Sequence, residues 1–220
     1  MPASVSRDEF AQKTSMGMYK AQKAYEKWSG GLWAWNAPEY LLTTYIAQEI
    51  SKIKDKPFYL TLEQHVGESL EAAGASEVDV KDTGKQKFDI MVWWGGDAPR
   101  GIIEVKKQVN SFDGGATGYG GIRKDVERII KSLEATSRLQ FGLLAYYTSC
   151  KFGERPRQSA ETRIRNRANS ISSGARKFVQ EKNMKFKRID GKIINFRDVT
   201  VKDGPNDHAW VAETLMIWGR

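Results

Sequence analysis

The chain has 220 residues, of which 40% are hydrophobic, and a formal net charge of +8 at pH 7. This length and apolar content predict one globular domain with a good core, or one domain with a small appendage, and exclude a disordered chain. The single cysteine, Cys150, excludes an intramolecular disulfide framework, and the two histidines, His65 and His208, lack the spacing of zinc ligands.

Membrane and secretory signals are absent from the sequence pattern. No run of eighteen apolar residues occurs, and the first ten residues, MPASVSRDEF, lack a hydrophobic signal core. We therefore expect a protein that does not enter membranes and that resides in the cytoplasm.

Positive charge is concentrated in one part of the chain. Residues 151–200 contain fourteen Lys or Arg against five Asp or Glu, whereas the other 21 basic and 22 acidic residues nearly cancel. A basic segment in a protein of pI near 9.4 is typical of proteins that bind a nucleic-acid backbone. A solvated basic face is the alternative interpretation.

The N-terminal residues 1–36 are expected to form an extension that packs on the core or mediates dimer contacts. A helix-compatible stretch runs from Asp8 to Trp28, and Ser29-Gly30-Gly31 follows as a stop signal. A second helix is predicted from Pro38 to Ile53 with Asn36 as its cap, because apolar residues recur there at helical spacing. Glu39 and Glu49 lie beside that apolar stripe.

Short elements are expected next. Phe58–Leu62 reads as a strand followed by Glu63, Val66–Ala73 as a helical turn ended by Gly74, and Val78–Val80 as a further strand.

The stretch from Lys87 to Val109 reads as two strands joined by a turn at residues 95–99. Each strand is an apolar run interrupted by one acid, Asp89 in the first and Glu104 in the second. Because side chains alternate along a strand, Glu104 and Lys106 share one face. An acid in a buried strand is costly unless it is paired or binds a metal ion, so these residues are candidates for an active site. An ion pair at a solvated strand edge is the alternative.

The remaining elements follow in a clear order. Residues 111–121 form a glycine-rich loop without the spacing of a nucleotide-binding turn, Ile122–Ala135 an amphipathic helix, and Phe141–Cys150 an apolar strand. A long helix over 158–182, a hairpin over Met184–Phe196 centred on Asp190-Gly191, and a last strand from Ala209 to Trp218 complete the chain. The candidate phosphate contacts are Lys124, Arg163, Arg165, Arg167, Lys185 and Lys187.

The spacing of Asp89, fourteen residues, then Glu104-Val105-Lys106 resembles the PD-(D/E)XK nuclease superfamily. Phe88 stands where the family name has proline. The predicted order over residues 37–150, helix, three strands, helix, strand, is also similar to the core of that superfamily. The resemblance implies an α/β protein with a restriction-endonuclease-like αβββαβ core, in which a mixed central sheet is flanked by helices. It assigns residues 37–150 to the core and 151–220 to a basic helix and hairpin packed on the same domain.

The resemblance also implies a site and an activity. Asp89, Glu104 and Lys106 would be catalytic, and Mg²⁺, replaceable by Mn²⁺, would be bound by Asp89, Glu104 and the Val105 carbonyl. One further acid would come from Glu39, with Glu49 and Glu63 as alternatives that spacing does not resolve. The implied activity is that of a metal-dependent nuclease, a DNA endonuclease above all, and a double-strand cut would require a homodimer.

Two rival interpretations remain open at this point. In the first, a nuclease-like fold serves as a catalytically inactive nucleic-acid-binding or assembly module. In the second, a basic partner-binding protein carries Glu104 and Lys106 only as a surface pair.

Overall fold

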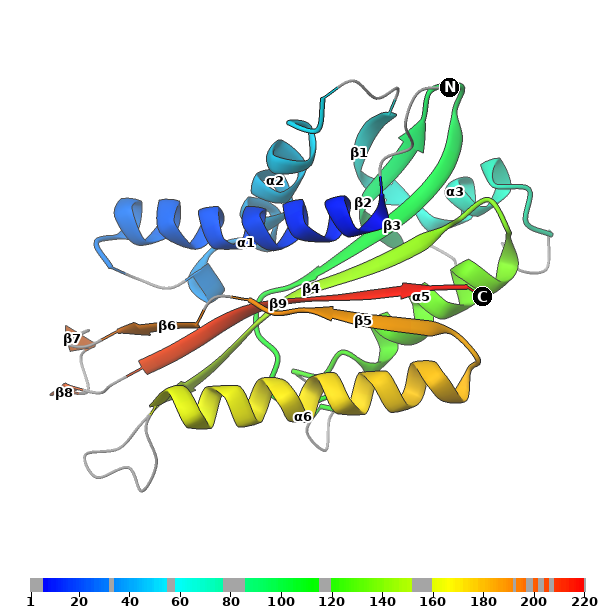
Figure 1. The fold of residues 1–220 in the computed structure, drawn as a ribbon. Helices are drawn as coiled ribbons and strands as arrows, with labels where there is room; N and C mark the ends of the chain where they lie inside the picture. The colour runs from blue at the N-terminus through cyan, green and yellow to red at the C-terminus, as the bar shows by residue number, and fades with distance from the viewer. Residues whose placement is uncertain are drawn as a thin grey trace.

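The structure is a computed structural model, and it describes residues 6–31, 34–54, 58–76, 86–114, 120–151, 160–191, 193–196, 200–201, 204–205 and 208–219. Figure 1 shows an α/β arrangement in which one mixed β-sheet lies between two layers of helices. The α/β class expected from the sequence is therefore confirmed.

The helices are α1 (Arg7–Ser29), η1 (Ala34–Asn36, a 3₁₀ turn), α2 (Glu39–Ile50), α3 (Val66–Ala72), α5 (Arg123–Ala135) and α6 (Ala160–Glu181). The strands are β1 (Phe58–His65), β2 (Lys87–Trp94), β3 (Ala98–Lys106), β4 (Phe141–Lys151), β5 (Lys185–Ile189), β6 (Ile193–Phe196), β7 (Thr200–Val201), β8 (Gly204–Pro205) and β9 (His208–Trp218).

The main sheet has seven strands in the order β1-β2-β3-β4-β9-β5, and β6 also pairs with β9. Its neighbours are antiparallel except for β3 and β4, which are parallel. A parallel pair requires a crossover, and α5 supplies it with a buried apolar face of Val126, Ile129, Ile130 and Leu133. The carboxyl ends of β3 and β4 consequently lie at the same edge of the sheet.

Each face of the sheet has its own hydrophobic core. Side chains of α1 and α2, such as Phe10, Met18 and Ile46, pack on the face formed by Ile90, Val92, Ile103 and Val105. On the opposite face, α3, α5 and α6 pack against residues that include Met91, Ile102 and Leu144. In Figure 1, α1 and α2 lie above the central strands β4 and β9, and α5 and α6 lie below them.

The N-terminal segment belongs to the first of these cores. The ring of Phe10 stacks on Phe141 of β4 at 5.2 Å between centroids, and the Tyr147 hydroxyl donates to the Met18 carbonyl. The predicted stop is confirmed because Gly30 ends α1 in the left-handed conformation at φ 73°. Residues 1–36 are expected either to pack on the core or to mediate dimer contacts, and α1 packs on the core.

The predicted hairpin over Met184–Phe196 is wrong. Among the described strands, β5 and β6 each pair with β9, so they form successive parts of one edge strand. The register shifts by one residue between Ile189↔Thr214 and Ile193↔Val211, which is the shift of a β-bulge. A Cβ on Gly191 would lie 1.4 Å from the Ala212 carbonyl oxygen, so the glycine serves this close approach rather than a hairpin turn.

Smaller differences concern element boundaries. The strand predicted to end at Leu62 continues to His65, so Glu63 lies inside β1. Pro38, not Asn36, directly precedes α2, and no side chain caps that helix. The predicted strand Val78–Val80 lies outside the described residues. Within the described part of the chain, no helix has the length and apolar character needed to cross a membrane.

We predict that Gly17→Ala destabilises the fold. An added Cβ would meet the Ile46 backbone at 2.5 Å, where α1 and α2 touch. Overpacking against backbone costs on the order of 3 kcal/mol, which exceeds the gain of about 1 kcal/mol in helix propensity. Urea unfolding should therefore show a net loss of about 2 kcal/mol, whereas Gln12→Ala, on the exposed side of the same helix, should change little. A stabilised Gly17→Ala variant would mean that α1 does not pack on α2 in this way.

Candidate active site

Asp89 lies where β2 and β3 separate. The last residue pair between the two strands on this side is Ile90↔Ile103. Beyond it, the Val105 N–H donates to Asp89 Oδ2 at 2.6 Å, so a side chain takes the place of a ladder bond. In an antiparallel ladder the N–H and C=O of one residue point toward the same neighbouring strand. The Val105 carbonyl is therefore directed to the side of β3 on which Asp89 lies.

The neighbouring strand β1 is also irregular at this level. Its pairs with β2 run from Leu62↔Ile90 to Gln64↔Phe88 and omit Glu63 opposite Asp89. Glu63 has a φ of 54°, which is unfavourable for a residue with a side chain. Such strained positions concentrate at functional sites, so the outlier supports a functional interpretation of this part of the sheet.

Glu104 is almost completely buried in β3, with 1% of its surface exposed. The Arg128 guanidinium, on α5, donates from Nε to Oε1 at 2.9 Å and from Nη2 to Oε2 at 2.6 Å. Burial raises the pKa of the Glu104 carboxyl, and Arg128 opposes this shift. The carboxylate is thus desolvated and depends on nearby positive charge.

Asp125 links the two cations of the site. Arg128 Nη2 donates to Asp125 Oδ1 at 3.1 Å, and Lys106 Nζ lies 3.4 Å from the same oxygen. Burial disfavours the charge on Lys106, but the surrounding carboxylates, Asp125 first and Glu39 second, outweigh it and raise the pKa of the lysine. The ammonium group is therefore charged at neutral pH.

The Asp89 carboxyl is held in an unfavourable environment for its charge. Burial raises its pKa to about 6, the hydrogen bond from Val105 opposes the shift, and Glu39 and Glu63 add to it. A carboxylate surrounded by other acids and partly removed from water gains stability when a cation approaches.

Glu39 and Glu49 differ in their surroundings. Glu39 begins α2, and its charge raises the pKa of both Asp89 and Lys106. Lys107 Nζ donates to the Ala37 carbonyl at 3.0 Å and so connects this end of the helix to the end of β3. Glu49, at the other end of α2, is buried and accepts from Lys20 Nζ at 2.8 Å and from Lys52. Glu49 therefore joins α1 to α2. These contacts argue against Glu49 as the further metal-binding acid, for which it was an alternative to Glu39.

Acids outnumber cations in this part of the sheet. The interacting carboxylates are Asp89, Glu104, Asp125, Glu39 and Glu63, and the cations among them are Lys106 and Arg128. Within the described residues, no three Asp, Glu, His or Cys side chains lie close enough to share one metal ion. Two carboxylates and one backbone carbonyl nevertheless suit Mg²⁺, which commonly binds one or two carboxylates and keeps several waters.

Asp125 and Arg128 are not among the predicted site residues, although they contact Lys106 and Glu104. A signal existed, because Asp125 falls within the buried apolar face of α5, beside Val126 and Ile129. An acid on such a face needs a partner, and the residue three positions later, Arg128, is correctly spaced to supply one.

The basic side chains predicted to contact phosphate fall into two groups. Arg167 donates to the Ser149 carbonyl near the carboxyl end of β4. The first turns of α6, which carry Arg163 and Arg165, therefore lie at the end of the sheet where β3 and β4 terminate, called here the acid-bearing edge because Glu104 lies near the end of β3. Arg165 also pairs with Glu161 at 2.6 Å. Lys124 is exposed on the first turn of α5, the helix that carries Asp125.

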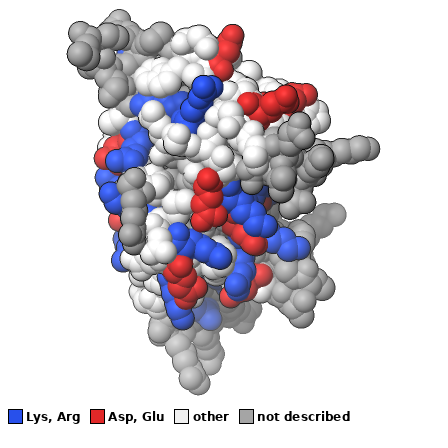
Figure 2. Space-filling model, turned by 90° about the vertical axis from the view of Figure 1, so that its right-hand side faces the viewer, with Lys and Arg blue, Asp and Glu red and all other residues white. Residues whose placement is uncertain are grey.

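Lys185 and Lys187 lie elsewhere. Lys185 pairs with Trp218 near the beginning of β4, and Lys187 Nζ contacts Asp8 of α1 at 2.8 Å, on the other face of the sheet. They are not brought together with the acids. The molecular face seen in Figure 2 carries acidic and basic side chains intermixed rather than one basic patch.

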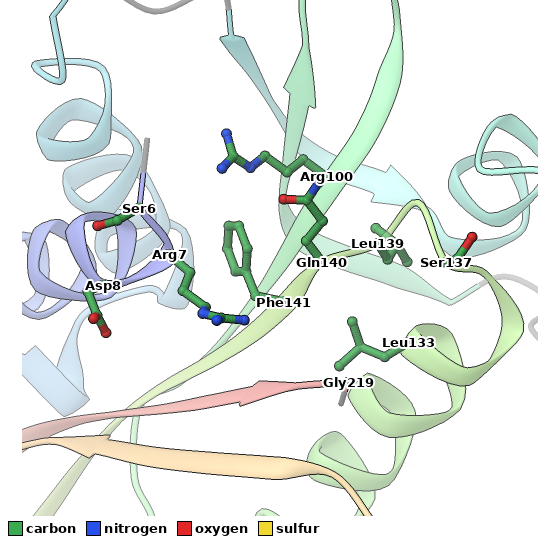
Figure 3. A pocket seen from close by; sticks show the side chains of 10 residues that line it. All are labelled: Ser6, Arg7, Asp8, Arg100, Leu133, Ser137, Leu139, Gln140, Phe141 and Gly219. Atoms are coloured by element: carbon green, nitrogen blue, oxygen red, sulfur yellow. The ribbon is translucent and has the colours of Figure 1, made fainter. Parts of the chain in front are cut away.

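A cavity of about 610 Å³ opens at the end of the sheet opposite the acids (Figure 3). Arg7, Arg100, Gln140, Phe141 and Gly219 are among the residues around it, and it includes none of the predicted site residues. Asp89, Glu104 and Lys106 are therefore not among the residues that line this cavity.

Comparison of the chain with protein-family models, with curated proteins and with solved structures finds no match in any of the three. The family resemblance consequently rests on the motif and on the order of the elements.

We predict that Asp89→Asn stabilises the metal-free protein above about pH 6. The folded protein binds the Asp89 proton more tightly than the unfolded chain does, since the folded pKa is about 6 against an ordinary value of 3.8. Stability therefore falls as pH rises through this interval, and the asparagine, which can still accept from Val105, removes the loss. Urea unfolding with a chelator present should show a gain on the order of 2 kcal/mol at pH 8 that vanishes below about pH 4.

The matched control is Asp113→Asn, which removes an exposed carboxylate paired with Arg123. It should shift stability by less than about 1 kcal/mol at either pH. A destabilised Asp89→Asn variant at pH 8 would show that the carboxylate is not desolvated in the folded protein.

Proposed function

We propose that this chain is a metal-dependent nuclease of the PD-(D/E)XK type that hydrolyses phosphodiester bonds in DNA as an endonuclease. The observation that carries the proposal is the convergence of Asp89, Glu104 and Lys106 at the point where β2 and β3 separate, within an excess of carboxylates. An excess of acids, of which Glu104 and Asp125 are buried, beside a charged lysine suits a site for a hard cation and a phosphate group.

The fold supports the same proposal. The order α2, β1, β2, β3, α5, β4, with β3 and β4 parallel, agrees with the αβββαβ core that the resemblance implies, apart from the short α3 between β1 and β2. Fold agreement alone does not select an activity, so the side chains of the site carry the functional argument.

In this proposal Asp89, Glu104 and the Val105 carbonyl hold Mg²⁺, or Mn²⁺ in its place. A bound divalent ion supplies Lewis-acid activation of the phosphoryl group and of a water molecule. Lys106, which is charged at neutral pH, orients that water and stabilises negative charge on the phosphate. Asp125 keeps the ammonium group in place from 3.4 Å.

Glu39 is the additional acid that the surroundings favour. It acts on the pKa of both Asp89 and Lys106, whereas Glu49 is bound by two lysines away from them. Glu63, on the strand next to Asp89, remains the second choice.

Arg163, Arg165 and Lys124 are proposed to contact the DNA backbone, because they lie at the acid-bearing edge of the sheet. A double-strand cut requires two such sites, so a homodimer in the cytoplasm is part of the proposal.

One observation favours a second candidate function, a catalytically inactive nucleic-acid-binding module. Arg128 contacts both oxygens of Glu104, which is the arrangement of a structural ion pair. This alternative predicts salt-sensitive DNA binding without Mg²⁺-dependent turnover.

We expect Asp89→Asn, Glu104→Gln and Lys106→Met each to reduce Mg²⁺-dependent cleavage of supercoiled DNA by at least about a hundredfold. Each variant removes the charge of a proposed metal ligand, or the charge beside the phosphate, while nearly keeping side-chain size. Circular dichroism and thermal unfolding confirm that the fold is retained. Full activity in any variant removes that residue from the mechanism, and an inactive wild-type protein that still binds DNA supports the non-catalytic module.

Binding should depend on the basic residues of α6 and not on those of β5. Arg163→Ala and Arg165→Ala should each weaken DNA binding and lower the slope of log K against log salt concentration by about one. Lys185→Ala and Lys187→Ala, at the opposite end of the sheet, should leave the slope unchanged. The reverse pattern in a fluorescence-anisotropy titration would place the DNA on the other face.

A further inference from the structure

We propose that Arg128 is an internal counter-ion that competes with the metal ion for Glu104, and that Asp125 receives its guanidinium when the metal binds. The inference rests on the proposed function, since it concerns how the same site admits its metal. It adds a positioning and regulatory role for α5, the helix that connects the two parallel strands.

The first step is the competition for Glu104. Arg128 engages Oε1 and Oε2 at 2.9 and 2.6 Å, and no part of the carboxylate is exposed enough to be hydrated in its place. Mg²⁺ binds carboxylate oxygens at about 2.1 Å. An ion at that distance and a guanidinium on the same oxygens would be neighbouring positive charges, which repel strongly at this depth. Binding of the metal to Glu104 therefore favours departure of Arg128.

The second step is the destination of the guanidinium. Asp125 precedes Arg128 by three residues on α5, and its Oδ1 already accepts from Arg128 Nη2 at 3.1 Å. Arg128 can thus leave Glu104 by a change of side-chain torsion while it keeps one partner on its own helix. About a quarter of its side-chain surface is exposed, so there is room on the solvent side for this movement.

The third step is the consequence for the metal-free protein. Glu104, buried among other acids, would be unpaired without a cation, and breaking a buried pair is strongly destabilising. Arg128 forms an ion pair with Glu104 until the metal binds. Asp125 then forms ion pairs with both Arg128 and Lys106. The site is therefore stable in both states, at the expense of weaker metal binding.

The test compares Mg²⁺ binding, without nucleic acid, by the wild-type protein and by Arg128→Lys. Lysine keeps the charge but cannot make the two-point contact of a guanidinium. Competition predicts that Arg128→Lys binds Mg²⁺ about tenfold more tightly, measured by isothermal titration calorimetry and by the Mg²⁺-dependent rise in melting temperature. An unchanged affinity would show that Arg128 acts only through its charge. A weaker affinity would show that Arg128 helps Glu104 to bind the metal. Either result overturns the proposal.

Two further variants keep the test decisive. Asp125→Asn removes the negative charge that receives the Arg128 guanidinium and should weaken Mg²⁺ binding severalfold, the opposite direction from Arg128→Lys. Lys131→Met removes an exposed charge from the same helix, where Lys131 pairs with Glu127, and should leave the affinity unchanged. If Arg128→Lys does not fold, an unchanged affinity in Asp125→Asn would overturn the proposal on its own.

The outcomes separate this inference from the proposed function. If the wild-type protein binds Mg²⁺ and cleaves DNA but Arg128→Lys does not bind Mg²⁺ more tightly, only the proposed role of Arg128 is overturned. If the wild-type protein neither binds Mg²⁺ nor cleaves DNA, both the proposed function and the role of Arg128 are overturned.

Discussion

The burial of Glu104 is the constraint on which the rest of the site depends. A carboxylate with 1% exposure in the middle of a sheet has lost its hydration and must be matched by positive charge. Arg128 meets that requirement only because α5 crosses over the sheet between β3 and β4 with Asp125 and Arg128 on its inner side. The placement of Lys106 follows from the same contact, since Asp125 holds both cations.

The second structural condition is the separation of β2 from β3. A continuous ladder would have consumed the Val105 N–H in backbone pairing and left Asp89 as a costly acid between strands. Instead, Asp89 accepts that N–H at 2.6 Å, and β1 skips a pair at Glu63 on its other side. The β2–β3 ladder ends, and the β1–β2 ladder omits one pair, at the level where the acids interact, and the strained φ of Glu63 is the local cost.

How much could be predicted from the sequence depends on the range of the interactions involved. Asp89, Glu104 and Lys106 could be selected as candidates, because the alternation of a strand is local and an acid in an apolar run is conspicuous. Arg128 could not be assigned with the same ease, since its partner depends on how α5 is rotated over the sheet. The hairpin failed for a related reason: Asp190-Gly191 fits a turn locally, but the eleven-residue β9, about twenty residues later, provides a longer edge for both segments.

A buried Arg–Glu fork is not in itself evidence for a metal site, as a second one in this protein makes clear. On the same face, two strands away, Arg188 donates to both oxygens of Glu213, from Nε at 2.5 Å and from Nη2 at 2.9 Å. Burial raises the pKa of Glu213 too, but the acid near it, Asp190, has 81% of its side chain exposed. Glu104 differs because the charges of two further acids, Asp89 and Asp125, raise its pKa, and Asp125 is itself buried. The proposed function therefore depends on the excess of acids around Glu104, and the fork at Glu213 is explained by folding alone.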